Sequence, residues 1–192
     1  YIDRNKLLWV ISRGNGLQIF SLHPENPSHY LQQKNEFIKE LENASARCMT
    51  VDKNEMLWVG TRYNGLMAFK NKNNSFILKQ HFQTVNGLTD NYVTSLASDK
   101  DGNIIIGTQT GLDRLIKTGD SSYRIENITK SNNIFSYINT VWTDAVNNTF
   151  ALTNGGNLLQ AEPVQHSIPG YEPQLLIEEI KINGKVIAYF SS

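Results

Sequence analysis

Leu57-Trp58-Val59-Gly60-Thr61, which follows Asp52 and precedes Gly65-Leu66, is the clearest copy of a pattern that occurs four times in the 192-residue chain. Each copy has an aspartate, then an apolar triplet, then a small residue or threonine at a turn. The aspartates of the four copies are Asp3, Asp52, Asp99 and Asp144, spaced 49, 47 and 45 residues apart. This period matches one four-stranded propeller blade rather than a helical repeat. We therefore predict an all-β fold, an arc of about four β-propeller blades.

The third copy shows how one blade is built. Residues 93–98 predict a half-buried strand, and residues 99–102 have the chemistry of a hairpin turn, because carboxylates bond nearby amides and glycine accepts a positive φ. Within residues 103–108, an unbroken run of three isoleucines precedes a glycine and a threonine, which predicts a strand buried on both faces where blades stack. A third strand over 112–116 and a weaker outer strand over 123–128 complete the blade.

These residues resemble the two-component regulator propeller repeat, whose motif places Leu-Trp-Ile-Gly-Thr before Gly-Gly-Leu. Residues 57–61 with 64–66 are similar to that motif, and residues 86–93 resemble its lead-in to the following blade. The copies in phase cover nearly residues 1 to 160, and the fourth departs most, because Ala151-Leu152 replaces the Trp-Ile core. The resemblance implies seven-bladed rings, usually two per sensor. We therefore expect this chain to be a fragment of a larger propeller.

The C-terminal residues follow a different pattern. Residues 173–187 alternate between apolar and polar side chains and turn at Asn183-Gly184, which predicts the start of a β-hairpin. This segment looks like the opening of the triple-tyrosine domain, an immunoglobulin-like module that follows such propellers. Three prolines mark a linker before it. The expected domains are propeller blades over 1–162, a linker over 163–173 and the beginning of the immunoglobulin-like domain over 174–192.

The composition excludes several partners. With 18 basic and 18 acidic residues and a pI near 7.1, the chain lacks the electrostatic footprint for nucleic acid or an anionic membrane. No apolar run approaches the roughly 20 residues that cross a bilayer, so we expect no direct membrane contact in this segment. The single cysteine, Cys48, falls in the first strand of the second copy, where we predict a small buried filler rather than a reactive thiol.

The sequence carries no recognisable catalytic or cofactor signature. The histidines lie in separate loop or linker regions without the short spacing of a metal site, at His23, His29, His81 and His166. Phosphate loops, dinucleotide fingerprints and nucleophile elbows are lacking. The repeated aspartates are interpreted as hairpin caps rather than a carboxylate ring, and Trp9 and Trp58 as core. We therefore predict no catalysis, no cofactor and no metal in this segment.

The repeat leaves side chains free at two places that open on one face of a propeller: the turn after the second strand and the connection into the next blade. Arginine, amide and aromatic groups there suit a sugar, through bonds to its hydroxyl or acid groups and stacking on its apolar face. The predicted ligand-binding residues are Arg13, Arg62, Tyr63, Asn64, Tyr92, Gln109, Thr110, Tyr137 and Asn154. The same face also holds Asn15, Arg47, Asp90, Asn91 and Phe135. Trp142 is expected to pack rather than to bind.

The resemblance also implies a function. It indicates the periplasmic sensor region of a hybrid two-component histidine kinase of Bacteroides-type bacteria, which senses an oligosaccharide or other small ligand. A movement would pass through the triple-tyrosine domain to a kinase outside this segment. The other implied partners are further blades of the same protein and a second copy in a homodimer. Two alternatives stay open: an interaction scaffold marked by a broad apolar patch on that face, and a propeller enzyme whose base or metal lies in other blades.

Overall fold

The computed structural model describes residues 1–2, 6–12, 16–23, 26–36, 38–72, 75–132, 134–162, 179–182 and 185–189. The sequence predictions that lie outside these residues include the turn at Asp3, the side chains of Arg13 and Asn15, the linker over 163–173, and the turn at Asn183-Gly184. The described chain is nearly all strand, which confirms the predicted all-β class. Among the described residues, no helix has the length and the apolarity needed to cross a bilayer.

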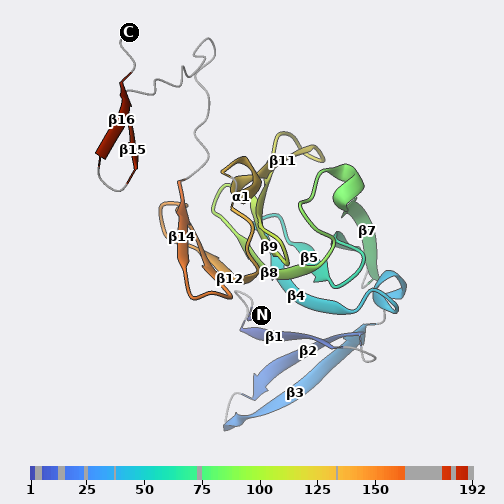
Figure 1. Cartoon of the computed structure of the whole chain (residues 1–192). Coiled ribbons are helices and arrows are strands. Elements are labelled where there is room, and N and C mark those ends of the chain that lie inside the picture. The colour runs from blue at the N-terminus through green and yellow to red at the C-terminus, as the bar shows by residue number, and fades with distance from the viewer. Residues whose placement is uncertain are drawn as a thin grey trace.

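Four antiparallel sheets follow one another in chain order (Figure 1). The first sheet contains β1 (Leu7–Ser12), β2 (Gly16–His23) and β3 (Asn26–Glu36). The second contains β4 (Ala46–Val51), β5 (Met56–Thr61), β6 (Leu66–Lys72) and β7 (Ser75–Phe82). The third contains β8 (Val93–Ser98), β9 (Ile104–Thr108), β10 (Leu112–Lys117) and β11 (Tyr123–Asn127). The fourth contains β12 (Ile138–Thr143), β13 (Thr149–Thr153) and β14 (Leu158–Ala161).

Short helices and a separate hairpin complete the described elements. The 3-10 helices η1 (Lys39–Leu41) and η2 (Thr84–Asn86) follow the first and second sheets, and α1 (Ile128–Ser131) follows the third. Near the C-terminus, β15 (Glu179–Ile182) pairs with β16 (Lys185–Tyr189) in an antiparallel hairpin, as the sequence predicts. The immunoglobulin-like domain to which this hairpin was assigned stays a prediction.

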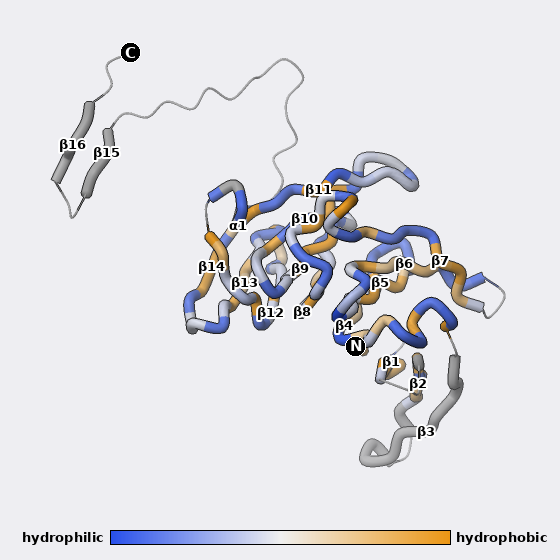
Figure 2. The backbone as a smooth tube through the Cα atoms, turned by 45° about the vertical axis from the view of Figure 1, so that its right-hand side comes forward, coloured by the Kyte–Doolittle hydropathy of each residue, from blue (hydrophilic) through white to orange (hydrophobic). Residues whose placement is uncertain are grey.

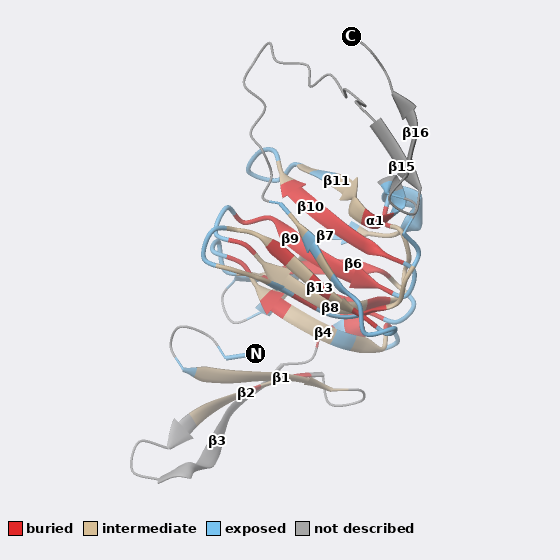
Figure 3. Ribbon diagram, turned by 60° about the vertical axis from the view of Figure 1, so that its left-hand side comes forward, coloured by how far each residue is buried: buried red, intermediate tan, exposed pale blue. Residues whose placement is uncertain are grey.

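The apolar core lies between neighbouring sheets. Along β5, Leu57 and Val59 pack with residues of the first sheet, whereas Trp58 packs with residues of the third. Along β9, Ile104 packs towards the second sheet and Ile105 towards the fourth. Hydrophobic residues accordingly run along β5 and β6 in Figure 2, and the buried residues gather in β6, β9 and β10 in Figure 3. This confirms the predicted strand buried on both faces, since a central strand covered by a sheet on each side needs apolar residues at successive positions.

Gly60 and Gly107 show how closely neighbouring sheets approach each other. A Cβ atom added to Gly60 would lie 2.4 Å from Cγ1 of Val93, in the first strand of the next sheet. One added to Gly107 would lie 2.8 Å from Cγ2 of Ile138, at the corresponding place one sheet later. Only a residue without a side chain fits at these positions. The small residue of the repeat is therefore a requirement of the contact between sheets.

The repeated aspartates Asp52, Asp99 and Asp144 close the first hairpin of the second, third and fourth sheets, as predicted. Oδ1 of Asp52 accepts hydrogen bonds from the amides of residues 54 and 56, at 2.8 and 3.0 Å. Oδ1 of Asp99 and Oδ1 of Asp144 accept the same pair of bonds from the amides two and four residues later. The residue three positions after the aspartate has a positive φ in every copy, at Lys6, Glu55, Gly102 and Asn147.

One predicted strand end is wrong. The outer strand of the third sheet was predicted to include Ile128, but β11 ends at Asn127 and Ile128 begins α1. The turn brings Thr129 back over β10, where its hydroxyl accepts a 2.8 Å hydrogen bond from the amide of Leu112. Thr129 is buried. A continued strand would carry this hydroxyl away from the amide, so the buried hydrogen bond favours the helical turn.

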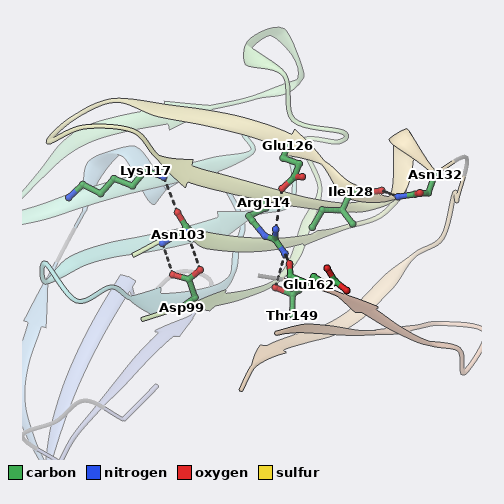
Figure 4. A network of polar contacts seen from close by, with 9 residues as sticks. All are labelled: Asp99, Asn103, Arg114, Lys117, Glu126, Ile128, Asn132, Thr149 and Glu162. Carbon is green, nitrogen blue, oxygen red and sulfur yellow. Dashed lines mark hydrogen bonds and ion pairs between the residues drawn. The ribbon is translucent and has the colours of Figure 1, made fainter. Parts of the chain in front are cut away.

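Arg114 joins the third and fourth sheets through a network of polar contacts (Figure 4). Its guanidinium donates to Oε2 of Glu126 at 3.2 Å, to the hydroxyl of Thr149 at 3.3 Å, and to the carbonyl oxygen of Glu162 at 2.6 Å. The Arg114 side chain is only 5% exposed. A buried charge needs this degree of pairing, so Arg114 is a structural residue.

Cys48 packs against the apolar cluster between the second and third sheets, as predicted, although it is partly rather than fully buried, and Trp142 also has the predicted packing role. Burial raises the pKa of the Cys48 thiol to about 12, which disfavours the nucleophilic thiolate. Trp142 stacks on Phe150 with ring centroids 5.4 Å apart and an interplanar angle of 14°. Trp142 nevertheless stays 42% exposed, because among the described residues no further sheet covers this face of the fourth sheet.

Candidate functional site

The two groups of predicted ligand-binding residues lie at one end of the sheets. The amide of Arg62 donates to the carbonyl oxygen of Ser45 at 3.1 Å, which ties the turn after β5 to the connection before β4. At the equivalent places in the next two sheets, the amide of Gln109 donates to the carbonyl oxygen of Tyr92 at 3.0 Å, and the amide of Asn154 donates to the carbonyl oxygen of Tyr137 at 2.8 Å. Three successive sheets therefore present a turn residue beside a connection residue.

At this end, side chains from three sheets form the arginine–tyrosine cluster, which we define as Arg47, Arg62, Tyr63, Tyr92 and Tyr137. The Arg47 guanidinium carbon lies 4.9 Å from the centre of the Tyr92 ring, and that of Arg62 lies 5.5 Å from the same centre. Arg62 also lies 5.4 Å from the Tyr63 ring. Tyr92 and Tyr137 meet edge to face, with centroids 6.2 Å apart. All of these separations lie in the range of cation–π and aromatic pairing.

The electrostatics of this cluster favour hydrogen-bond donation. Burial raises the pKa of the Tyr137 phenol, its interaction with Tyr92 raises it further, and Arg47 and Arg62 only partly offset the rise. Tyr137 therefore keeps its proton at neutral pH and can donate it in a hydrogen bond. Arg47, Arg62 and Tyr63 are exposed, so the guanidinium groups and a phenol ring face solvent together.

The remaining predicted residues surround or support this cluster. Thr110 donates to Oδ2 of Asp90 at 3.2 Å, and Oδ1 of Asp90 accepts from the amide of Tyr92 at 2.8 Å. The carbonyl oxygen of Asn64 lies 2.7 Å from Nε2 of His81. Gln109 and Asn154 are exposed beside Tyr92 and Tyr137. Arg13 lies outside the described residues.

A second concave region, with a volume of about 860 Å³, was not predicted from the sequence. The aspartate turns at Asp52, Asp99 and Asp144 line it, so it lies at the opposite end of the same strands from the arginine–tyrosine cluster. The Lys100 ammonium in its wall donates to the carbonyl oxygen of Ala145 at 2.6 Å. Its shape depends on the angles between sheets, which no local sequence pattern specifies.

The described residues hold a buried carboxylate, Asp113, but no metal-binding cluster. In the part of the chain that the structure describes, no group of three or more His, Cys, Asp and Glu side chains is placed to hold a metal ion. Asp113 is a buried carboxylate, and burial raises its pKa. Its oxygens accept hydrogen bonds from the amide and hydroxyl of Thr89 and from Asn127. Those bonds fix the connection before β8, which is a structural role.

Comparison with known proteins supports the repeat and the fold. Residues 87–110 match the family model described as Two component regulator propeller. The extracellular domain of BT3049, named as a hybrid two component system of B. thetaiotaomicron, superimposes with a TM-score of 0.60 and 22% identity, over 94% of this chain and 23% of that chain. The extracellular domain of BT4673 from the same organism gives a TM-score of 0.61 and 14% identity, over 85% and 22% of the two chains.

The fold is also found in enzymes. A catalytically inactive virginiamycin B lyase from Staphylococcus aureus superimposes with a TM-score of 0.54 and 14% identity, over 88% of this chain and 55% of that chain. No curated protein sequence gives a significant match. The chain spans about a quarter of the two B. thetaiotaomicron domains. These similarities establish the β-propeller fold, and residues 87–110 carry a two-component regulator propeller repeat.

Proposed function

We propose that this chain is a sensing part of the periplasmic region of a hybrid two-component histidine kinase, and that it binds an oligosaccharide. The repeat over 87–110 and the shared fold of two extracellular sensor domains support the sensor assignment. The kinase and any catalytic step lie in other parts of the parent protein.

The observation that carries the ligand proposal is the arginine–tyrosine cluster. Three sheets supply it, and its side chains combine two guanidinium groups with three phenol rings at one exposed end. Sugars are held by such groups, because a guanidinium offers paired donors to ring hydroxyls and an aromatic face covers the apolar side of the ring. Tyr92 lies within the matched repeat over 87–110, and the other four residues of the cluster lie outside it.

Ligand binding acts on the kinase by shifting the placement of the propeller relative to the module that begins with the β15–β16 hairpin. A ligand changes such an equilibrium only if it binds one arrangement more tightly than the other. Deleting residues 170–192 in the parent sensor should therefore abolish ligand-dependent signalling. Signalling that persists after this deletion would rule out this route.

The direct test is calorimetric titration of the complete periplasmic region with a panel of plant and host oligosaccharides. Arg62→Ala and Tyr63→Ala should each weaken binding of the recognised glycan, while Arg124→Ala, an exposed arginine on β11 outside the cluster, should leave it unchanged. Binding that neither cluster variant affects would place the site elsewhere in the parent protein. No binding across the panel would contradict an oligosaccharide sensor.

A second function is favoured by one observation. Phe135 is 69% exposed and Tyr63 58% exposed at the same end of the sheets. Exposed aromatic side chains are enriched in protein interfaces. A propeller that serves as an interaction scaffold would use this end for a protein partner, and light scattering of the complete periplasmic region, with Phe135→Ser as the variant, separates this function from sugar binding.

A further inference from the structure

Two positive charges share one aromatic ring in the arginine–tyrosine cluster. Arg47 lies 4.9 Å and Arg62 5.5 Å from the centre of the Tyr92 ring. Because both distances end at the same ring centre, the two guanidinium carbons lie no farther apart than the sum of these distances. Arg47 comes from β4, whereas Arg62 comes from the turn after β5. Like charges at this separation repel, weakly in water and more strongly as a bound molecule displaces water.

No acidic side chain in the described residues compensates for these charges, since neither guanidinium makes an ion pair or a hydrogen bond there. Asp90, in the connection before β8, already accepts bonds from the amide of Tyr92 and the hydroxyl of Thr110.

Arg114 shows what a structural arginine looks like in the same chain. Its guanidinium is buried and has a carboxylate, a hydroxyl and a carbonyl oxygen as partners. Arg47 and Arg62 are exposed, are positioned by ring contacts, and keep their donors unused among the described residues. Ring contacts fix the direction of a guanidinium without consuming its in-plane donors, so the two groups are pre-oriented for an acceptor.

We propose that the arginine–tyrosine cluster binds an anionic sugar, whose carboxylate or sulfate group is received by Arg47 and Arg62. The planar fork of arginine matches either acid group with two parallel hydrogen bonds. The Tyr63 ring covers an apolar face of the sugar, and the Tyr137 hydroxyl donates to a ring oxygen or hydroxyl. This inference rests on the proposed function, since it names the class of oligosaccharide.

The test compares charged and neutral forms of the same sugar. The complete periplasmic region is titrated with trigalacturonate and with its methyl ester, and with sulfated N-acetyllactosamine, which has no carboxylate, and its unsulfated form. At least one acid should bind at least tenfold more tightly than its neutral counterpart, and raised salt should weaken it. The pair of sugars that shows this preference identifies whether the site binds a carboxylate or a sulfate.

Variants connect the preference to the two arginines. Arg47→Ala and Arg62→Ala should each weaken binding of the acid at least tenfold and reduce its advantage over the neutral form. Arg62→Lys should recover only part of the loss, because an ammonium keeps the charge but lacks the fork. Arg124→Ala is the matched control for a lost positive charge, and thermal unfolding of every variant shows whether it folds.

The outcomes separate this inference from the proposed function. Equal binding of charged and neutral sugars, or acid binding that neither arginine variant weakens, would overturn the anionic site and leave an oligosaccharide sensor standing. Failure of all four probes while a neutral glycan binds would do the same. Absence of binding by any saccharide would overturn both.

Discussion

The second and third sheets differ from the fourth at two equivalent positions. Six residues after the repeated aspartate, Trp58 and Ile105 are fully buried, whereas Phe150 is only partly buried. The ring of Phe150 stacks on that of the exposed Trp142. Eight residues after the aspartate, the second and third copies have glycine and the fourth has Leu152.

This difference identifies what the repeat encodes. Gly60 and Gly107 lie where the first strand of the following sheet approaches most closely, at Val93 and Ile138. Leu152 occupies the equivalent place in a sheet whose outer face meets no further sheet among the described residues. The glycine is therefore a property of the contact between two sheets, and a strand of this fold does not need it.

The largest expected effect comes from removing a tryptophan on the covered face. Trp58→Ala should lower the free energy of unfolding by about 3–5 kcal/mol, because it leaves a cavity and deprives Oδ2 of Asp52 of the indole hydrogen bond at 3.1 Å. Trp142→Ala, on the uncovered face, should cost only about 1 kcal/mol. Urea unfolding followed by circular dichroism measures both, and similar losses for the two variants would contradict the comparison.

Adding one methyl group at the sheet contact should be the next largest effect. Gly60→Ala should destabilise the chain by roughly 1–3 kcal/mol, since the new Cβ overpacks the contact with Val93. Val93→Ala in the same chain should recover part of this loss. Gly155→Ala is the control, because its Cβ would find its nearest neighbour at an ordinary 3.5 Å. Urea midpoints that move equally for the two glycines would disprove the steric explanation.

Removing a turn aspartate should matter more in the third copy than in the fourth. Asp99→Ala should cost about 2 kcal/mol, because its buried carboxylate accepts three hydrogen bonds, from two amides and the Asn103 side chain. Asp144→Ala breaks the equivalent bonds at a more exposed turn and should cost less. Thermal unfolding of the two variants measures the order, and the reverse order would exclude burial as the cause.

The smallest expected effect is a pH dependence of opposite sign at two aspartates. Hydrogen bonding by Asn148 lowers the pKa of Asp144, so its contribution to stability is present above the unfolded pKa and is lost as pH falls through the folded pKa. Burial raises the pKa of Asp113, so its contribution is present below the unfolded pKa and is lost as pH rises through the folded pKa.

The check is the stability difference between the unchanged chain and each asparagine variant, from about pH 3 to pH 7. The difference should grow with pH for Asp144→Asn and shrink with pH for Asp113→Asn. Parallel profiles for the two variants would show that the two carboxyl groups do not titrate in opposite senses.

The periodic part of the fold was predictable from the sequence. Residues 93–98 were predicted as a strand and form β8, and the turn at Gly102 has the expected positive φ. These features depend on local chemistry, which each copy repeats. The end of β11 was mispredicted because Thr129 forms a bond to Leu112, far along the chain, and such a contact overrides local β propensity.

The candidate site was predictable as a set of positions but not as an arrangement. Arg62, Tyr63, Tyr92 and Tyr137 follow from the spacing of the repeat, since each comes just before or just after a strand of known phase. The sharing of the Tyr92 ring by Arg47 and Arg62 depends on the distance between two sheets. A residue pattern carries no measure of that distance.

Successive residues of β5 belong to two different apolar clusters, and this limits which insertions and deletions the chain can accept during evolution. Leu57 and Trp58 are adjacent in sequence but belong to different cores, so inserting or deleting one residue in this strand would expose both cores at once. Gain or loss of a whole copy leaves every remaining strand in phase and alters only the contacts at its two sides. Duplication of the complete unit is therefore the tolerated step of growth, and point insertions are confined to the turns.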